Sequence, residues 1–174
     1  MDKVLLLHSS TDGQTVKILN RIKDELSELY HCDVMDANTV PDIDFNAYSK
    51  VMIGASIRYG HLNKKLYQFI EKYAEALKNI NAAFFCVNLT ARKPGKDTPE
   101  TSKYVQTFIQ KSPWTPEVMD VFAGALYYPR YRWFDRVMIQ FIMRMTGGET
   151  DPTKEIEYTN WDRVGAFAHR FRTL

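Results

Sequence analysis

A short polar loop near the N-terminus has the residue types that bind an anion. It follows the apolar residues 4–7 and precedes a stretch in which Val16, Leu19 and Ile22 recur at helical spacing. The start of a helix offers unpaired N–H groups and the positive end of a dipole, and hydroxyl side chains add further donors. The seven residues of this loop are Ser9, Ser10, Thr11, Asp12, Gly13, Gln14 and Thr15. We therefore expect them to hold a phosphate group.

The composition of the loop excludes two common classes of phosphate site. It lacks the Gly-x-Gly-x-x-Gly pattern of dinucleotide sites and the Gly-Lys-Ser/Thr ending of NTPase loops. A hydroxyl-rich loop without lysine suits a terminal monophosphate, such as that of FMN. A plain helix cap of Ser, Thr and Asp is the alternative interpretation. A position directly after the first strand of an α/β chain favours the phosphate site.

Short apolar runs alternate with amphipathic stretches along the chain. We expect strands at residues 4–7, 32–35, 51–54, 82–87 and 118–125, and helices between them. Thr98 followed by Pro99 predicts one helix start, and Asn160 lies in the cap of the last helix. This alternation predicts an α/β fold with a doubly wound, five-stranded parallel sheet. No repeat or linker divides the sequence, so we expect a single domain over residues 1–174.

Residues 126–158 form an insertion after the fifth strand, far longer than a typical connection from a strand to a helix. Within it, polar residues recur every fourth position at Arg132, Arg136, Gln140 and Arg144, and the positions between them are mostly apolar. A wide apolar face with a cationic stripe is typical of a helix that lies on a membrane surface. Packing against the domain, or against a second subunit in a homo-oligomer, remains open as the alternative.

Charge and cysteine content place further bounds on function. The chain of 174 residues has 23 basic and 21 acidic residues and a net charge of +2, which by itself excludes neither nucleic acid nor membranes as partners. We expect no nucleic-acid partner. We also expect no metal site, because Cys32 and Cys86 lack metal-ligand spacing. The N-terminal residues lack the features of a signal peptide, and no apolar run is long enough to span a bilayer. We therefore expect a cytoplasmic protein.

Several segments carry a resemblance to a known family. Residues 10–15 resemble the flavodoxin phosphate loop, which is rich in Thr and Gly and ends in Thr. The resemblance is closer at residues 54–61, with the sequence Gly-Ala-Ser-Ile-Arg-Tyr-Gly-His, and at residues 87–94, 124–133 and 147–151. Together these segments resemble the bacterial quinone-dependent protoporphyrinogen oxidases of the flavodoxin superfamily.

The resemblance implies a fold, a cofactor and an activity. A flavodoxin-like domain would bind FMN and oxidise protoporphyrinogen IX to protoporphyrin IX in haem synthesis. The electrons would pass to menaquinone or ubiquinone, with the enzyme attached to the inner face of the inner membrane as a peripheral protein. The insertion would then serve as the membrane or substrate segment.

The resemblance also implies which loops flank the flavin ring. The first follows the third strand and contains Ser56, Ile57, Arg58, Tyr59, Gly60 and His61. The second follows the fourth strand and contains Asn88, Leu89, Thr90, Ala91 and Arg92. Tyr59 would stack on the ring, and backbone groups near Asn88 would bond its edge.

Three residues of these loops are candidates for catalysis. Arg58 and Arg92 would stabilise the anionic reduced flavin or pair with the substrate's propionates. His61 is a candidate proton shuttle, because the ordinary pKa of histidine is near neutrality. Solvated loop charges and a helix-capping histidine are the alternative interpretations.

Three other functions compete with this one. An electron-carrier flavodoxin is disfavoured, because such carriers are strongly acidic and this chain is not. An NAD(P)H:quinone reductase on the same fold stays open, since it needs no separate nicotinamide motif. A flavin-free membrane-binding interaction module is the non-enzymatic alternative, and an absorbance spectrum would distinguish it.

Overall fold

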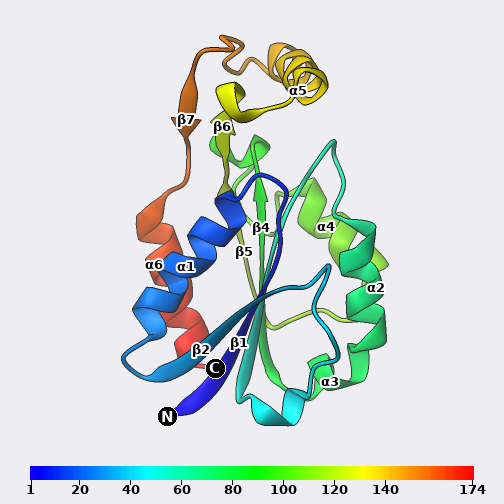
Figure 1. The fold of residues 1–174 in the computed structure, drawn as a ribbon, viewed down its shortest axis with the longest axis vertical. Helices are drawn as coiled ribbons and strands as arrows, with labels where there is room; N and C mark the ends of the chain where they lie inside the picture. Colours follow the sequence, from blue (N-terminus) through cyan, green and yellow to red (C-terminus); the bar gives the residue numbers. More distant parts are fainter.

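A parallel five-stranded sheet lies at the centre of the chain, whose computed structural model describes residues 1–174 (Figure 1). Its strand order is β2-β1-β3-β4-β5. The strands are β1 (Asp2–Ser9), β2 (Tyr30–Asp36), β3 (Lys50–Ser56), β4 (Asn81–Asn88) and β5 (Val118–Ala123). The helices around the sheet are α1 (Gln14–Leu26), α2 (Lys64–Lys72), α3 (Ala74–Lys78), α4 (Lys103–Lys111) and α6 (Trp161–Arg172). The predicted doubly wound α/β fold is therefore confirmed.

Helices cover both faces of the sheet. Helices α1 and α6 lie on one face, and α2, α3 and α4 lie on the other (Figure 1). The apolar run in β1 serves both layers: Val4 and Leu6 pack toward α1 and α6, and Leu5 and Leu7 pack toward α2 and α4. Successive side chains of a strand point to opposite faces, so a strand buried on both sides is apolar throughout.

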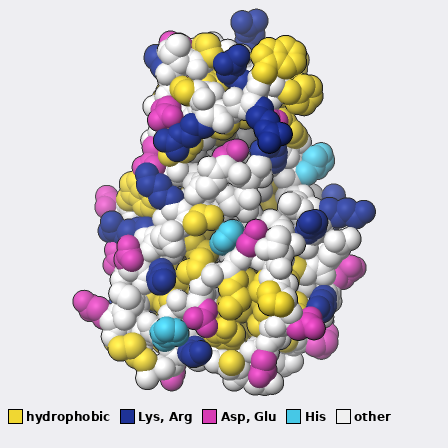
Figure 2. Space-filling model, viewed as in Figure 1, with side chains coloured by type: hydrophobic (Ala, Val, Ile, Leu, Met, Phe, Trp, Pro, Cys, Tyr) yellow, Lys and Arg dark blue, Asp and Glu magenta, His cyan; other side chains and the backbone are white.

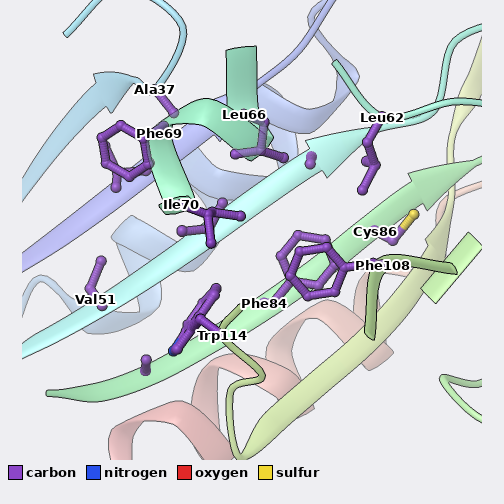
Figure 3. Packing of buried hydrophobic residues seen from close by; sticks show 14 of the residues in the cluster. Ala37, Val51, Leu62, Leu66, Phe69, Ile70, Phe84, Cys86, Phe108 and Trp114 are labelled. Carbon is purple, nitrogen blue, oxygen red and sulfur yellow. The ribbon is translucent and has the colours of Figure 1, made fainter. Parts of the chain in front are cut away.

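The layer under α2 and α4 is rich in aromatic side chains (Figure 3). Phe84 of β4 and Phe108 of α4 stack with their ring centroids 4.2 Å apart, and Trp114 meets Phe108 edge-on. All three side chains are buried. Each contributes roughly 1.5 to 3 kcal/mol through burial, so this layer stabilises the sheet strongly.

The chain leaves the sheet after β5 and packs against it again only at α6, and residues 124–160 between them are called the excursion below. The short strands β6 (Ala125–Tyr127) and β7 (Glu155–Glu157) pair antiparallel and form a stem. Helix α5 (Trp133–Met145) lies at the far end of this excursion, above the carboxyl ends of the sheet strands (Figure 1). The helix within the insertion was predicted from the sequence, but the stem was not, because strands of three residues are too short to show an alternating pattern.

Two element boundaries differ from the prediction. Strand β5 ends at Ala123 and not at residue 125, since Ala125 already belongs to β6. The predicted helix start at Thr98 is wrong, because α4 begins at Lys103. The Thr98 and Thr101 hydroxyls bond each other at 2.8 Å and close a separate turn. Ser102 then provides the cap of α4. The cap of α6 at Asn160 is as predicted.

Three short 3-10 helices complete the structure: η1 (Phe45–Ala47), η2 (Thr90–Arg92) and η3 (Tyr128–Arg130). No helix combines the length and the apolar character that crossing a membrane requires.

Candidate functional site

A pocket opens at the carboxyl ends of β1, β3 and β4, where the strand order reverses direction. This is the place where open α/β sheets bind ligands. The predicted site residues that line it are Ser10, Asp12, Gln14, Ser56, Ile57, Arg58, Tyr59, Gly60, Asn88, Leu89 and Thr90. The other predicted residues, Ser9, Thr11, Gly13, Thr15, His61, Ala91 and Arg92, lie in the same loops but outside the lining.

The first loop has unpaired donors at the start of α1. Gly13 takes the cap position in the left-handed region, at φ 87°, and no side chain caps the helix. The Thr15 hydroxyl is buried in the first turn and has no hydrogen-bond partner. A buried hydroxyl without a partner beside uncapped N–H groups costs free energy unless a ligand satisfies it. These observations fit a phosphate group at this position.

Two predicted side chains of this loop have other partners. The Ser9 hydroxyl donates to the Asn38 side chain at 3.1 Å. The Gln14 amide donates to the Thr159 hydroxyl at 3.0 Å and accepts from the Tyr127 hydroxyl at 2.9 Å. These side chains position the loop and the stem of the excursion, so only their backbone groups remain for a ligand.

The loop after β3 is a tight turn over residues 58–61. The backbones of Arg58 and His61 exchange two hydrogen bonds, of 2.9 and 3.0 Å. The central residues Tyr59 and Gly60 have φ values of 49° and 81°, which is typical of a type I′ turn. The left-handed conformation is unfavourable for tyrosine by roughly 1 to 2 kcal/mol, so other contacts must hold Tyr59 in place.

Asp135 of α5 provides those contacts. Its carboxylate accepts a hydrogen bond from the Tyr59 hydroxyl and lies 2.7 Å from the Arg58 guanidinium. These two hydrogen bonds lower the pKa of Asp135. Arg58 also reaches Asp12 of the first loop at 3.5 Å. Burial raises the pKa of Asp12, and the charge of Arg58 opposes that shift. Arg58 thus joins the first loop, the turn and the excursion.

The loop after β4 is fixed by its own side chain. The Asn88 carboxamide accepts a hydrogen bond from the Ala91 N–H at 2.9 Å. The Ile57 N–H donates to the Val87 carbonyl at 2.9 Å and so joins the loop after β3 to the end of β4. Hydrogen bonds within the chain therefore fix both loops that form the pocket walls.

Two of the three catalytic candidates do not face the pocket. The Arg92 guanidinium donates to the Leu89 carbonyl at 2.7 Å and to the Thr146 carbonyl, at the end of α5, at 3.3 Å. The His61 side chain is exposed and lines a neighbouring cavity. Only Arg58 lies in the lining.

Glu157 of the stem holds the excursion against the start of α1. It accepts hydrogen bonds from Lys17, from the Trp161 indole at 2.8 Å and from the Gln14 amide at 3.2 Å. Burial alone would raise the pKa of Glu157, but these hydrogen bonds outweigh burial and lower the pKa to about 2. Glu157 is therefore ionised across the physiological range, and its contacts fix the stem.

Sequence reasoning missed part of the lining. The residues concerned are Val87, Tyr104, Gly124, Ala125, Tyr131, Ile139 and Ile142. Most of them lie in segments that the sequence indicated for another reason, either the family resemblance or the helical pattern of the insertion. Tyr104 belongs to α4 and Ile142 to α5, and both helices have apolar residues at helical spacing. Their helical spacing alone does not distinguish a pocket wall from a core position.

Helix α5 exposes large apolar side chains next to the pocket. Phe134 and Phe141 are each 60% exposed, and Trp133 and Met145 even more so. Figure 2 shows apolar side chains and Lys or Arg side chains together at this end of the molecule. On its other side, α5 buries Met143, and Ile142 lines the pocket. A single helix therefore presents an apolar face to solvent and apolar side chains to the site.

Comparisons with known proteins show the family to which the chain belongs. The flavodoxin domain model matches residues 5–153. The protoporphyrinogen IX dehydrogenase [quinone] of Escherichia coli K12 is 46% identical over 173 residues, covering 99% of this chain and 96% of that protein. The protein of that name from Leishmania major is 47% identical over 174 residues, covering 99% of this chain and 75% of its own length.

Solved structures show the same fold at low sequence identity. Oxidised flavodoxin 1 from Bacillus cereus superposes with a TM-score of 0.53 at 16% identity, covering 98% of this chain and 97% of its own. A short-chain flavodoxin associated with a bacterial microcompartment reaches 0.54 at 12% identity, covering 99% and 98%. These flavodoxins share the fold with this chain, whereas the two dehydrogenases also share sequence with it over 99% of its length.

Proposed function

The chain belongs to the flavodoxin domain family, and we propose that it is a protoporphyrinogen IX dehydrogenase with a quinone acceptor. This is the name of its relatives at 46% identity. It binds FMN, oxidises protoporphyrinogen IX to protoporphyrin IX and passes the electrons to menaquinone or ubiquinone. The observation that carries this proposal is the pocket lined by both the first loop and α5. An electron carrier needs no such cover over its site.

The residues at the start of α1 suit the FMN phosphate. The Thr11 and Thr15 hydroxyls and the N–H groups that follow Gly13 would hold it, and the unpartnered Thr15 hydroxyl would gain its missing bond. The ring would lie between the turn at residues 58–61 and the loop at residues 88–92. Bound FMN supplies the two-electron chemistry that no protein side chain here can supply.

The chain's own residues shape the rest of the pocket. Ile57, Leu89, Ile139 and Ile142 give it apolar walls, which exclude water and favour a macrocyclic substrate or a quinone head group. Asp135 holds Arg58 and Tyr59 at the rim. We propose that these contacts keep α5 over the pocket while substrate and quinone exchange beside it.

We also propose that α5 attaches the enzyme to the inner face of the membrane. Burying one large apolar side chain contributes roughly 1.5 to 3 kcal/mol, so several together give reversible attachment. Arg132, Arg136 and Arg144 flank the exposed apolar face, and each basic residue near an anionic leaflet adds about 1 kcal/mol. A long-tailed quinone in the membrane would then lie next to the pocket.

An anaerobic assay with the purified protein tests the activity. Protoporphyrinogen IX and a quinone should give fluorescent protoporphyrin IX, and the protein should show the absorbance of bound flavin. Rapid turnover with NADPH as electron donor, together with slow oxidation of protoporphyrinogen, would assign the chain to the NAD(P)H:quinone reductases instead.

Flotation with anionic liposomes tests the membrane proposal. Changing Phe134, Phe141 and Met145 to Ser should release the protein from vesicles while FMN content stays the same, because none of the three lines the pocket. Leu29→Ser removes an exposed apolar side chain outside the excursion and is the matched control. A wild-type protein that stays at the bottom of the gradient and sediments as a dimer would make α5 a subunit interface.

A further inference from the structure

The arginines expected to bind the substrate's carboxylates already have partners within the chain. Arg58 is paired with Asp135 at 2.7 Å and reaches Asp12 as well. Arg92 donates to the carbonyls of Leu89 and Thr146 and lies outside the pocket lining. A carboxylate that bound either guanidinium would have to displace a contact that holds α5 in place. Cations that have no carboxylate partner within the chain are therefore better placed to bind the propionates of the substrate.

A second cavity lies beside the pocket, between α2 and α4. Its volume is about 490 Å³. It shares Ile57, Gly60 and Tyr104 with the first pocket, so the two cavities adjoin at the turn after β3. A ligand that reaches from one to the other would have one part at the flavin site and another part between the helices.

The charged groups of this cavity are mainly cationic. Lys64 lies at the start of α2 and Lys111 at the end of α4, and both line the cavity. Neither lysine makes an ion pair with any carboxylate of the chain, whereas Arg58 at the rim of the first pocket pairs with both Asp12 and Asp135. His61 lines the cavity as well, and Glu71 is its one acidic residue.

The remaining walls suit an amphipathic ligand. Tyr67 and Tyr104 are both half-buried and add ring surface to the cavity that the two lysines also line. An aromatic side chain pairs a large apolar body with a polar tip, which favours a ligand of mixed character. The cavity thus offers aromatic surface and two ammonium groups to a ligand that is partly apolar and negatively charged.

We propose that Lys64 and Lys111 bind the two propionate carboxylates of the tetrapyrrole substrate. Charge-assisted hydrogen bonds from two ammonium groups would anchor the carboxylates between α2 and α4. The macrocycle would then extend past Gly60 and Tyr104 to the flavin pocket. This inference rests on the proposed function and names the part of the site that selects a dicarboxylic substrate.

Substrate pairs that differ only in charge test the inference. Protoporphyrinogen IX carries two carboxylates, and its dimethyl ester carries none. In the variant Lys64→Gln/Lys111→Gln, we expect KM for the acid to rise about tenfold, as for the loss of one to two charge-assisted contacts. The kcat for the acid and the KM for the ester should stay within about twofold of wild type. Binding of protoporphyrin IX to the flavin-loaded protein, followed by its fluorescence, should weaken by a similar factor.

Two further variants serve as controls. Lys65→Gln/Lys103→Gln removes the same charge from the same two helices, but neither residue lines the cavity, so KM should not change. Lys64→Arg/Lys111→Arg keeps the charges and should restore most of the affinity.

Three results would overturn the inference. These are an unchanged KM for the acid in the glutamine variant, an equal loss with acid and ester, or the same loss in the control variant. A wild-type protein that binds porphyrin through these lysines but does not oxidise porphyrinogen would instead overturn the proposed function, and the binding comparison would still test the lysines.

Discussion

The sheet and the excursion use phenylalanine in opposite ways. Phe84 and Phe85 of β4 are fully buried between the helical layers, whereas Phe134 and Phe141 of α5 are each 60% exposed. The sheet gains its stability by removing apolar surface from water. The excursion leaves comparable surface in contact with water, so that surface is available to another apolar phase.

The interactions that stabilise the excursion also differ from those that stabilise the sheet. The excursion has a small core, made of Leu126, Tyr128 and Met143. Polar contacts join it to the rest of the chain, chiefly at Glu157 in the stem and at Asp135 on α5. Ion pairs and hydrogen bonds depend on pH and on single side chains more than apolar packing does. The excursion should therefore respond to changes that leave the sheet unaffected.

The largest expected effect concerns the apolar residues. Phe84→Ala removes a ring that stacks on Phe108, and we expect it to lower the free energy of unfolding by about 3 to 5 kcal/mol. Phe141→Ala removes a similar ring from the surface and should change that free energy by no more than about 0.5 kcal/mol. Denaturant titration of both variants measures the difference. Equal losses would mean that α5 packs against a part of the chain or a second copy.

The next effect concerns the cofactor. Thr15→Val keeps the shape of the side chain but removes the unpartnered hydroxyl, and we expect FMN affinity to fall by about 1 to 3 kcal/mol. Titration of the apoprotein with FMN measures this, with stability as a second readout. Thr173→Val removes a hydroxyl at the end of α6 and is the control. Unchanged affinity in Thr15→Val would place the phosphate elsewhere.

Glu157 in the stem should make the free energy of unfolding depend on pH in the acid range. The pKa of Glu157 is lowered to about 2, so its contribution is complete above its ordinary value of 4.5 and is lost as pH falls toward 2. Glu157→Gln should therefore be less stable than wild type at neutral pH, by less than the pKa shift alone implies, because water screens this partly exposed carboxylate. The difference should shrink between pH 4.5 and 2, as thermal unfolding across this range would show. A difference that is constant with pH would mean that the carboxylate charge contributes nothing.

The smallest effect concerns the link between α5 and the turn. Asp135→Asn weakens the contacts to Arg58 and Tyr59, which are partly exposed, and should lower the free energy of unfolding only slightly, because water screens these contacts. Amide hydrogen exchange should become faster in the first turn of α5 and at residues 58–61 but stay the same in β1. Faster exchange throughout the sheet would contradict the separation of the two regions.

The sheet was predictable because each element carries its own pattern. Residues 4–7 are apolar throughout because both faces of β1 are covered, and helical spacing marked the inner faces of α1 and α6. The start of α4 was not predictable, since a Thr-Pro pair suits either a helix cap or the turn that Thr98 and Thr101 close.

The candidate site was predictable by loop but not by side chain. The sequence indicated which loops meet at the carboxyl end of the sheet, because that follows from strand order. It did not indicate that Gln14 bonds Thr159 or that Arg92 bonds Thr146, since both contacts join residues more than fifty positions apart. The cavity at Lys64 and Lys111 depends on the spacing of two helices and has no sequence signal of its own.

Anaerobic half-reactions of the purified protein test most directly whether the pocket serves protoporphyrinogen oxidation. Protoporphyrinogen IX should bleach the visible absorbance of the bound flavin within one turnover, and a quinone added afterwards should restore it. NADPH in place of the porphyrinogen should bleach it far more slowly. A flavin that is reduced by NADPH but not by protoporphyrinogen, or that is not reoxidised by quinone, would contradict the proposed function.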